Sequence, residues 1–317
     1  MAYSSRKHRV TPEFSRRGVM RRSALAVSLM TASVGVVTFA TSTVTSATSS
    51  GTTLFSQTFT DNSLSSTGGS LFIPMLPSGS LANAACLTVQ GSTANIPSCS
   101  GTSDSNGSGA LQLTPASGTQ EGGVFSTVSV PSTQGLDINF NTYQYNGTGA
   151  DGIAFVLAAA DPTSPQPPSA MGQSGGSLGY SSSSASNGLV NGYLGIGFDV
   201  YGNYSNGSYN GSGCGTAPAW ISASSTVPGQ VVVRGPGTST TGYCPLYSTA
   251  TSTSSSPLAL HNASATSRSG VTVPVEVIIN TTSSSFTSPR SSTTVTPGDF
   301  AVVFTPIGGS QTVLGVC

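Results

Sequence analysis

The sequence predicts an all-β protein made of two antiparallel sheets packed as a sandwich. After residue 47, no segment shows helical periodicity, whereas apolar runs of strand length recur to the end of the chain. Turn-forming Gly, Ser and Asn residues separate these runs, as is typical of sandwich folds. A sandwich of about 250 residues forms one domain, so we expect a single folded domain with long loops.

The expected strands follow one another as short apolar runs. In order they cover residues 54–59, 110–114, 124–130, 136–145, 153–159, 193–200, 230–234, 271–277, 300–304 and 312–316. The run 153–159 is continuously apolar, which predicts a central strand covered on both faces. Alternate valines give 271–277 one apolar face, and Pro274 among them predicts an edge strand or a bulge. The stretches rich in Ser and Thr, 181–186, 248–256 and 281–294, are expected loops.

Residues 1–47 have the layout of an export signal followed by a short linker. Seven of the ten basic residues lie within residues 1–22, and an uncharged, mostly apolar stretch follows at 23–40. Small residues ending at Ala40 or at Ala47 provide cleavage sites. Residues 15–20, SRRGVM, resemble a bacterial twin-arginine signal, with an ordinary basic leader as the alternative. The apolar part has about 18 residues, so an uncleaved membrane anchor stays open as a second role.

The charge of the remaining chain limits its partners. Without residues 1–47 the chain keeps three arginines, nine acidic residues and no lysine, a net charge of −6. No cationic footprint for a nucleic acid can form from so few basic residues. We expect a secreted or cell-surface bacterial protein that contacts a membrane only through an uncleaved signal segment.

The five cysteines predict disulfides, as expected for an exported protein. Four of them allow three pairings, and we expect Cys86–Cys99 and Cys214–Cys244 because each closes a short local loop. Cys317 is left over and is the last residue. A zinc site is the competing interpretation, but there is no C-x-x-C pair and only one histidine after residue 47.

Three short motifs stand in a fixed order along the chain. Residues 150–152 (ADG) precede the apolar run, residues 175–179 read GGSLG, and residues 199–203 (DVYGN) end the next strand. This order resembles the legume (L-type) lectins and their bacterial relatives, which carry A-D-G, then G-G-x-L-G, then D-x-[YF]-x-N. The resemblance covers most of residues 54–317. It implies a jelly-roll, concanavalin A-like sandwich and non-catalytic carbohydrate binding, with a glycan or polysaccharide as partner.

The resemblance also implies a role for individual residues in the sugar site. The residue matching Asp151 accepts hydrogen bonds from two sugar hydroxyls, and the N–H matching Gly176 donates another. The side chain matching Asn203 donates to the sugar, and the ring matching Tyr201 lies against the sugar face. The peptide matching Ala150–Asp151 is cis in the family.

A metal site is implied next to the sugar site. Asp199, Tyr201 and Asn203 can aim a carboxylate, a backbone carbonyl and an amide oxygen at one point, and oxygen ligands suit Ca²⁺. In the family the matching groups bind calcium, and we expect the ion and Asn203 to balance the Asp151 charge. Gly197 stands where the family has a metal-binding Glu, and no histidine follows the strand. We therefore expect weak calcium binding and no transition metal.

The resemblance has a second departure at its end. The family continues for two further strands and a fourth sugar-contacting loop, whereas this sequence stops at Cys317. The expectation is a domain at 54–317 that lacks its last strands, or one that another chain completes, with an exposed sheet edge. Whether the protein forms oligomers stays open.

Two other functions compete with sugar binding. A structural surface protein or adhesin with a lost sugar site would explain the missing ligands and strands. A glycoside hydrolase on the same sandwich is less favoured, because it needs two suitably spaced carboxylates. The sandwich glucanases carry E-x-D-x-[x]-E, whereas only Glu121 and Glu276 occur after residue 47, far apart in sequence. Each motif also has a plain alternative as a turn or a flexible loop.

Overall fold

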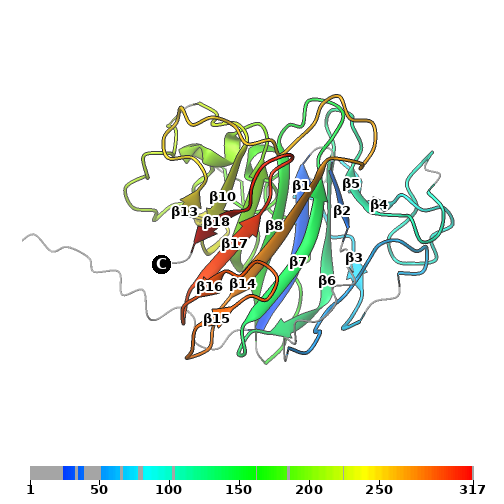
Figure 1. Cartoon of the computed structure of the whole chain (residues 1–317), viewed down its shortest axis with the longest axis horizontal. Helices are drawn as coiled ribbons and strands as arrows, with labels where there is room; N and C mark the ends of the chain where they lie inside the picture. Colours follow the sequence, from blue (N-terminus) through cyan, green and yellow to red (C-terminus); the bar gives the residue numbers. More distant parts are fainter. Residues whose placement is uncertain are drawn as a thin grey trace, which may run out of the picture.

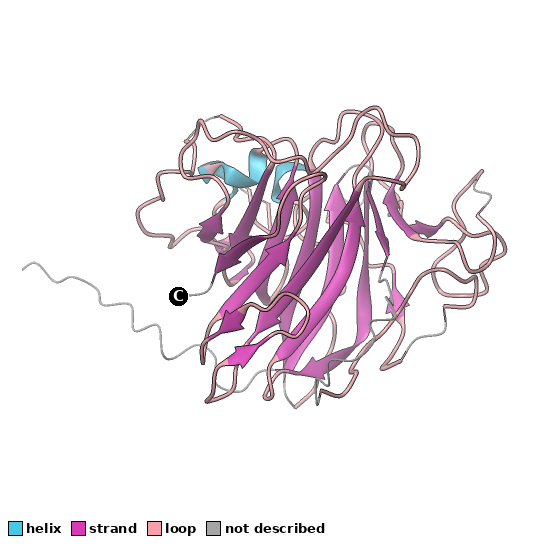
Figure 2. Cartoon of the chain, in the orientation of Figure 1, coloured by secondary structure: helices cyan, strands magenta, loops and turns pink. Residues whose placement is uncertain are grey.

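The computed structural model describes residues 24–32, 35–38, 51–64, 67–77, 81–101, 104–161, 163–183, 186–223 and 225–315. Within these residues the protein is all-β and without α-helix, and every ladder between named strands is antiparallel (Figures 1 and 2). Two large sheets and one small ribbon make up the described fold. The predicted all-β, antiparallel class is confirmed.

The first sheet, called sheet A, has nine strands. Its main order is β12-β11-β9-β8-β1-β6-β3, and β10 pairs with β9 and β13. The strands are β1 Ala24–Ala32, β3 Leu71–Phe72, β6 Glu121–Pro131, β8 Gly152–Ala160, β9 Gly192–Asp199, β10 Gln230–Arg234, β11 Gly237–Thr238, β12 Thr241–Gly242 and β13 Pro245–Ser248.

The second sheet, called sheet B, has seven strands in the order β18-β17-β14-β7-β2-β5-β4. They are β2 Gly35–Thr38, β4 Cys86–Leu87, β5 Leu111–Thr114, β7 Leu136–Tyr143, β14 Thr272–Ile279, β17 Phe300–Phe304 and β18 Thr312–Gly315. The ribbon pairs β15 Phe286–Thr287 with β16 Thr294–Val295. Within the described residues, β18 is the edge of sheet B and pairs with β17 alone.

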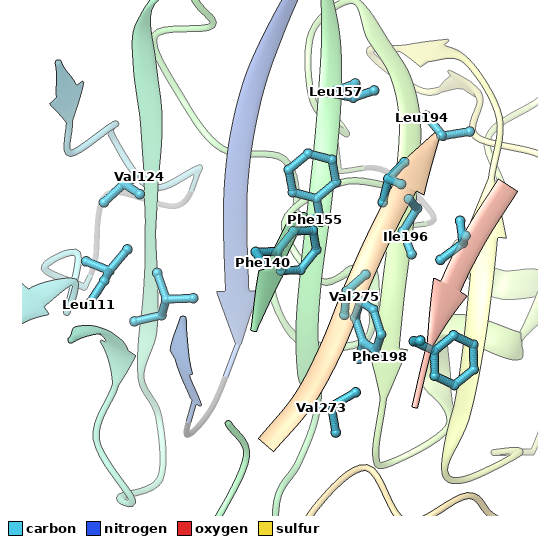
Figure 3. Packing of buried hydrophobic residues seen from close by; sticks show 14 of the residues in the cluster. Leu111, Val124, Phe140, Phe155, Leu157, Leu194, Ile196, Phe198, Val273 and Val275 are labelled. Atoms are coloured by element: carbon cyan, nitrogen blue, oxygen red, sulfur yellow. The ribbon is translucent and has the colours of Figure 1, made fainter. Parts of the chain in front are cut away.

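The main core lies between the two sheets, in a sandwich-like arrangement (Figure 3). Phe140 of sheet B stacks on Phe155 of sheet A with ring centroids 4.9 Å apart, and Phe198 meets Phe304 edge-on at 6.0 Å. Offset and edge-to-face pairs of this kind add to the stabilisation from burial. The alternating apolar residues of each strand therefore meet their counterparts from the other sheet.

The central strand β8 is covered on both faces, as its continuous apolar run predicts. Phe155 and Leu157 point into the core between the sheets, whereas Ala154 and Val156 belong to a second apolar cluster on the outer face of sheet A. Phe125 of β6 and Val232 of β10 also belong to that second cluster, and long loops supply most of its other members, including Tyr204. These loops carry the motifs of the candidate site, so the outer face of sheet A is its foundation.

Three local expectations are wrong. Residues 54–59 form no strand and contribute only an isolated bridge between Ser56 and Thr67. The stretch 281–294 is not a plain loop, because it contains β15 and the start of β16. Pro274 marks neither an edge nor a bulge, since β14 lies between β7 and β17 in continuous register with β7.

The position of Pro274 explains why a central strand tolerates it. Its carbonyl accepts a hydrogen bond from the Thr305 N–H at 3.2 Å, one residue beyond the end of β17. The N and the carbonyl of one strand residue face the same neighbouring strand. The N–H that proline lacks would therefore face Thr305, beyond the end of the β17 ladder, so proline forgoes one terminal hydrogen bond and leaves the ladder inside the sheet intact.

The apolar segment assigned to the export signal provides two strands. β1 lies between β8 and β6, with Ser28 opposite Val156 and Leu29 opposite Val124, and β2 lies between β5 and β7 (Figure 1). Both cleavage sites and the paired arginines lie outside the described residues. Cleavage at either site would remove both strands, so the N-terminal residue of the purified protein decides which role the segment has.

Both predicted disulfides are present, Cys86–Cys99 and Cys214–Cys244. The first ties the loop that follows β4, and the second ties the loop before β13 to the region after β9. Cys317 lies outside the described residues. Two disulfides fit an extracellular protein.

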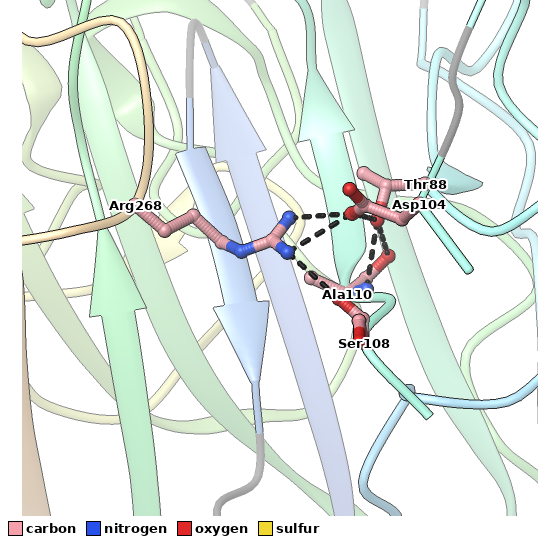
Figure 4. A network of polar contacts seen from close by, with 5 residues as sticks. All are labelled: Thr88, Asp104, Ser108, Ala110 and Arg268. Atoms are coloured by element: carbon pink, nitrogen blue, oxygen red, sulfur yellow. Dashed lines mark hydrogen bonds and ion pairs between the residues drawn. The ribbon is translucent and has the colours of Figure 1, made fainter. Parts of the chain in front are cut away.

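Near Cys99, a polar network fastens the loop before β5 to the loop before β14 (Figure 4). The Arg268 guanidinium lies 2.9 Å from the Asp104 carboxylate and donates to the Ser108 carbonyl at 2.8 Å. Thr88 donates to the same carboxylate at 2.6 Å. Both charged side chains remain partly exposed, so this ion pair is a modest local clamp.

Candidate functional site

Three loops that are separate in the sequence meet at one end of sheet A. β8 and β9 are antiparallel neighbours with Gly152 opposite Asp199, so the start of β8 lies beside the end of β9. Asp151 directly precedes β8, and Asn203 lies in the loop that follows β9. The third loop holds the 3-10 turn η1, Gly175–Ser177, which contacts η2, Asn203–Ser205. Figure 2 shows the short helical turns gathered at this end.

Asp151 is half-buried, and its main partner is an amide from a distant loop. The Asn203 Nδ2 donates to Asp151 Oδ1 at 3.0 Å, and the Tyr201 N–H donates to the Asp151 carbonyl at 3.0 Å. Burial raises the pKa of Asp151, while the Asn203 hydrogen bond lowers it. The Ala150–Asp151 peptide is cis. The amide therefore provides part of the compensation that a carboxylate in front of an apolar strand requires.

The glycine motif lies directly against these two residues. A Cβ on Gly176 would come within 2.3 Å of the Asn203 Cβ and 2.5 Å of the Tyr209 ring, so only glycine fits there. A Cβ on Gly175 would lie 3.7 Å from Asp151 Oδ2. Among the described residues, the Gly176 N–H has no hydrogen-bond acceptor. Asp151, Gly176 and Asn203 therefore share one small region, as the motif order predicts.

A pocket of about 520 Å³ opens beside Asp151. Its walls come from the turn before β6, the turn before β8 and the start of η1; the lining residues are Leu81, Ala116, Ser117, Gly118, Thr119, Gln120, Glu121, Gly147, Thr148, Gly149, Ala150, Asp151, Ser174 and Gly175. Small and polar residues predominate, and the two carboxyl groups are Asp151 and Glu121. Tyr201 is 50% exposed and lies on the neighbouring loop, outside this lining.

Asp199 is completely buried and binds the backbone of its own loop. Its Oδ1 accepts from the Gly202 N–H at 2.8 Å, and its Oδ2 accepts from the Tyr204 N–H at 2.7 Å. Gly202 has φ of +102°, and a Cβ there would lie 2.5 Å from the Val227 backbone, so glycine is required. Burial raises the pKa of Asp199 to about 7, although the two N–H donors lower it.

The predicted calcium ligands do not fit an ion held by Asp199. Calcium takes six to eight oxygen ligands, and a ligand loop turns its carbonyl oxygens toward the ion. Here the loop turns two N–H groups toward the carboxylate instead, one on each oxygen. The described residues also contain no group of three or more His, Cys, Asp or Glu that could hold a metal. Calcium binding stays a prediction, and we derive no role for the site residues through the ion.

The structure adds residues that sequence reasoning missed. Glu121 lines the pocket although it lies at the start of β6, and its Oε2 is buried without a partner among the described residues. The Tyr209 ring packs on Gly176. Burial is the main cause that raises the pKa of the Tyr209 hydroxyl, and the charges of Asp151 and Asp199 raise it further. Arg234 ends the apolar run 230–234, where a charge after three valines was the available signal.

Comparisons with protein-family models, with curated proteins and with solved structures find no match to this chain. In the described part of the chain, no helix has the length and hydropathy needed to span a membrane.

Proposed function

We propose that this protein is an exported, non-catalytic carbohydrate-binding protein of bacterial origin, with a jelly-roll, concanavalin A-like architecture. One observation carries the proposal. The Asn203 amide lies 3.0 Å from the Asp151 carboxylate, and Gly176 packs against Asn203, so three motifs from three loops meet beside one pocket. The cis peptide before Asp151 agrees with the family that these motifs resemble.

The polar groups of this site suit sugar hydroxyls. Within the described residues, Asp151 Oδ2 has no hydrogen-bond donor, and the Gly176 N–H has no acceptor, so one acceptor and one donor remain for a ligand. The exposed ring of Tyr201 offers an apolar face for the sugar C–H groups. A site built to hydrogen-bond hydroxyls rejects ligands without them, because its half-buried polar groups would then stay unpaired.

A glycan array with matched aspartate variants tests the proposal. Asp151 and Asp161 flank the same strand, and Asp161 is fully exposed. We expect the wild-type protein and Asp161→Asn to bind the same glycans, and Asp151→Asn to lose about 100-fold in affinity, since a charged hydrogen-bond acceptor is removed. Equal binding by Asp151→Asn and wild type would refute the proposed site. An array without any bound glycan, for a protein that melts cooperatively, would favour the structural adhesin instead.

A glycoside hydrolase is the second candidate, because Glu121 lines the same pocket as Asp151. Glycosidases need one carboxyl as acid and another as base or nucleophile. Burial and Asn203 are the influences on the pKa of Asp151, and Glu121 is not among them. Asp151 therefore lacks the partner carboxyl that a glycosidase uses. Release of reducing sugar that stops in Glu121→Gln would nevertheless establish this function.

A further inference from the structure

Arg234 is a buried cation without a buried anion bonded to it. It is the last residue of β10, and it is completely buried. Among the described residues, no carboxylate lies within ion-pair distance of its guanidinium. Burial lowers the pKa of Arg234 to about 10, which still leaves the group charged at neutral pH. Such a charge is costly unless hydrogen bonds satisfy it.

The Arg234 guanidinium donates most of its hydrogen bonds to the loop that carries Asn203. It donates to carbonyl oxygens on η2, on the residue after it and on the next turn, η3, Gly207–Tyr209. Its acceptors are Tyr204 O at 2.8 and 3.2 Å, Asn206 O at 3.1 Å, Tyr209 O at 3.0 Å, Asn210 Oδ1 at 2.6 Å and Tyr243 O at 2.9 Å. The Tyr204 ring also lies 4.8 Å from the guanidinium carbon, a cation–π distance.

Asp199 and Arg234 hold the two backbone polar groups of one residue, Tyr204. Asp199 accepts from the N–H of Tyr204, while Arg234 donates two hydrogen bonds to the carbonyl of that residue. A negative group on the N–H and a positive group on the carbonyl both complement the peptide dipoles. Because Asn203 directly precedes Tyr204, this clamp fixes the backbone that directs the Asn203 amide toward Asp151.

We propose that Arg234 and Asp199 together hold residues 202–210 in the binding geometry, so that the sugar site works without calcium. The inference rests on the proposed function for its ligand, but the clamp itself is a property of the fold. The guanidinium supplies inside the chain the positive charge that a bound cation would supply in the family that the motifs resemble. Arg234 touches no ligand and is therefore a positioning residue.

The first test compares the full chain in EDTA and in millimolar CaCl₂. A calcium ion at 100 times its Kd would raise the Tm of a domain of this size by roughly 5–10 °C. We expect a Tm difference below about 1 °C and glycan affinities that agree within about twofold, because no bound ion contributes. A rise in Tm of several degrees with calcium, or a tenfold loss of affinity in EDTA, overturns the proposal.

The second test is Arg234→Lys, with Arg268→Lys as the matched control outside the site. Lysine keeps the charge but cannot span carbonyls on several turns. We expect Arg234→Lys to lose about tenfold or more in glycan affinity, while Arg268→Lys binds like wild type. NMR titration gives a readout without sugar: if Asn203 moves away, the pKa of Asp151 rises relative to wild type. An unchanged Asp151 pKa in Arg234→Lys refutes the positioning role.

Two further outcomes, a variant that does not fold and a protein that binds no glycan, can be told apart. If Arg234→Lys does not fold, Asn210→Ala replaces it as the test variant, because it removes one hydrogen-bond acceptor of Arg234. The pKa of Asp151 is then again expected to rise relative to wild type. If no glycan binds at all, the proposed function fails. The calcium melt and the Asp151 titration then still decide whether the clamp exists and whether it needs the ion.

Discussion

Asp199 on β9 and Glu276 on β14 are both buried carboxyl groups, one in each sheet, but their neighbours differ. Asp199 receives two backbone N–H donors, one on each oxygen. Glu276 receives one hydroxyl, from Ser288 at 2.6 Å, and its Oε2 is buried without a partner among the described residues. Its nearest acidic neighbour is another carboxyl, Asp137 of β7, on the same face of sheet B.

The difference shows what a buried acid requires. Burial, and then the charge of Glu276, raise the pKa of Asp137 to about 6, because ionising Asp137 beside a second carboxyl is unfavourable even though its side chain reaches solvent. At Asp199 burial is the main cause that raises the pKa, with a smaller contribution from the Asp151 charge, against two opposing N–H donors. The first site organises a loop through its oxygens, whereas the second retains a proton up to about pH 6, and the N–H of an amide could take its place. Substitution by an amide should therefore have opposite effects at the two sites.

The largest effect is expected for Asp199→Asn. The amide oxygen can accept one N–H, but the NH₂ group would face the other N–H; a protonated carboxyl, by contrast, keeps lone pairs on both oxygens. We expect the free energy of unfolding, measured by urea denaturation, to fall by about 3–5 kcal/mol. The exposed Asp161→Asn should change it by less than about 0.5 kcal/mol. A loss below about 1 kcal/mol for Asp199→Asn would mean that these hydrogen bonds do not hold the loop.

The second effect is the pH dependence of stability. Both Asp137 and Asp199 have folded-state pKa values, about 6 and about 7, above the ordinary value of 3.8. The folded chain then binds protons that the unfolded chain has released, so stability is highest below about pH 4 and falls as pH rises to about 7. Each full pKa unit at the buried Asp199 corresponds to about 1.4 kcal/mol, so the Tm should drop by roughly 10 °C, whereas the exposed Asp137 contributes less because solvent screens it.

Variants separate the two contributions to this pH dependence. Asp137→Asn should reduce the slope of Tm against pH between about pH 4 and pH 6 without abolishing it, and leave the slope from about pH 6 to pH 7 unchanged, because Asp199 contributes over the whole interval. Hydrogen bonds from Thr163 lower the pKa of Asp161, so this group would make stability rise with pH. Because Asp161 is fully exposed, we expect its contribution to be negligible. A Tm that rises steadily from pH 4 to pH 7 would contradict the assignment of both raised pKa values.

Much of the fold was predictable because its signals are local. The apolar run of β8, the alternating valines of β14 and the short cysteine spacings each specify one element within a few neighbouring residues. The meeting of Asp151 with Asn203 was predictable for a different reason. The motif order carries information about the fold, and the pairing of β8 with β9 then brings the two loops together.

What could not be predicted depends on contacts between distant segments. Arg234 and the carbonyl groups of the Tyr204 loop are connected by no motif, and neither are Asp137 and Glu276. The segment 24–38 was ambiguous for a physical reason. An uncharged run of apolar and small residues suits both a signal peptide and a central strand, so periodicity alone cannot separate the two roles.

The smallest expected effect, and the one of opposite sign, is that of Glu276→Gln. The new amide can donate to the Asp137 carboxylate, which removes the repulsion between the two acids, while its oxygen keeps the Ser288 hydrogen bond. We expect the free energy of unfolding at pH 8 to rise by about 1 kcal/mol, and the difference from wild type to shrink near pH 4, where Asp137 is protonated. Ser288→Ala is the matched control, since it removes the hydroxyl donor and should destabilise by about 1 kcal/mol at both pH values. If Glu276→Gln destabilised the protein at pH 8 as strongly as Asp199→Asn, both side chains would be needed as hydrogen-bond acceptors on both oxygens. The contrast between a carboxylate that organises a loop and a carboxyl pair that retains a proton would then be lost.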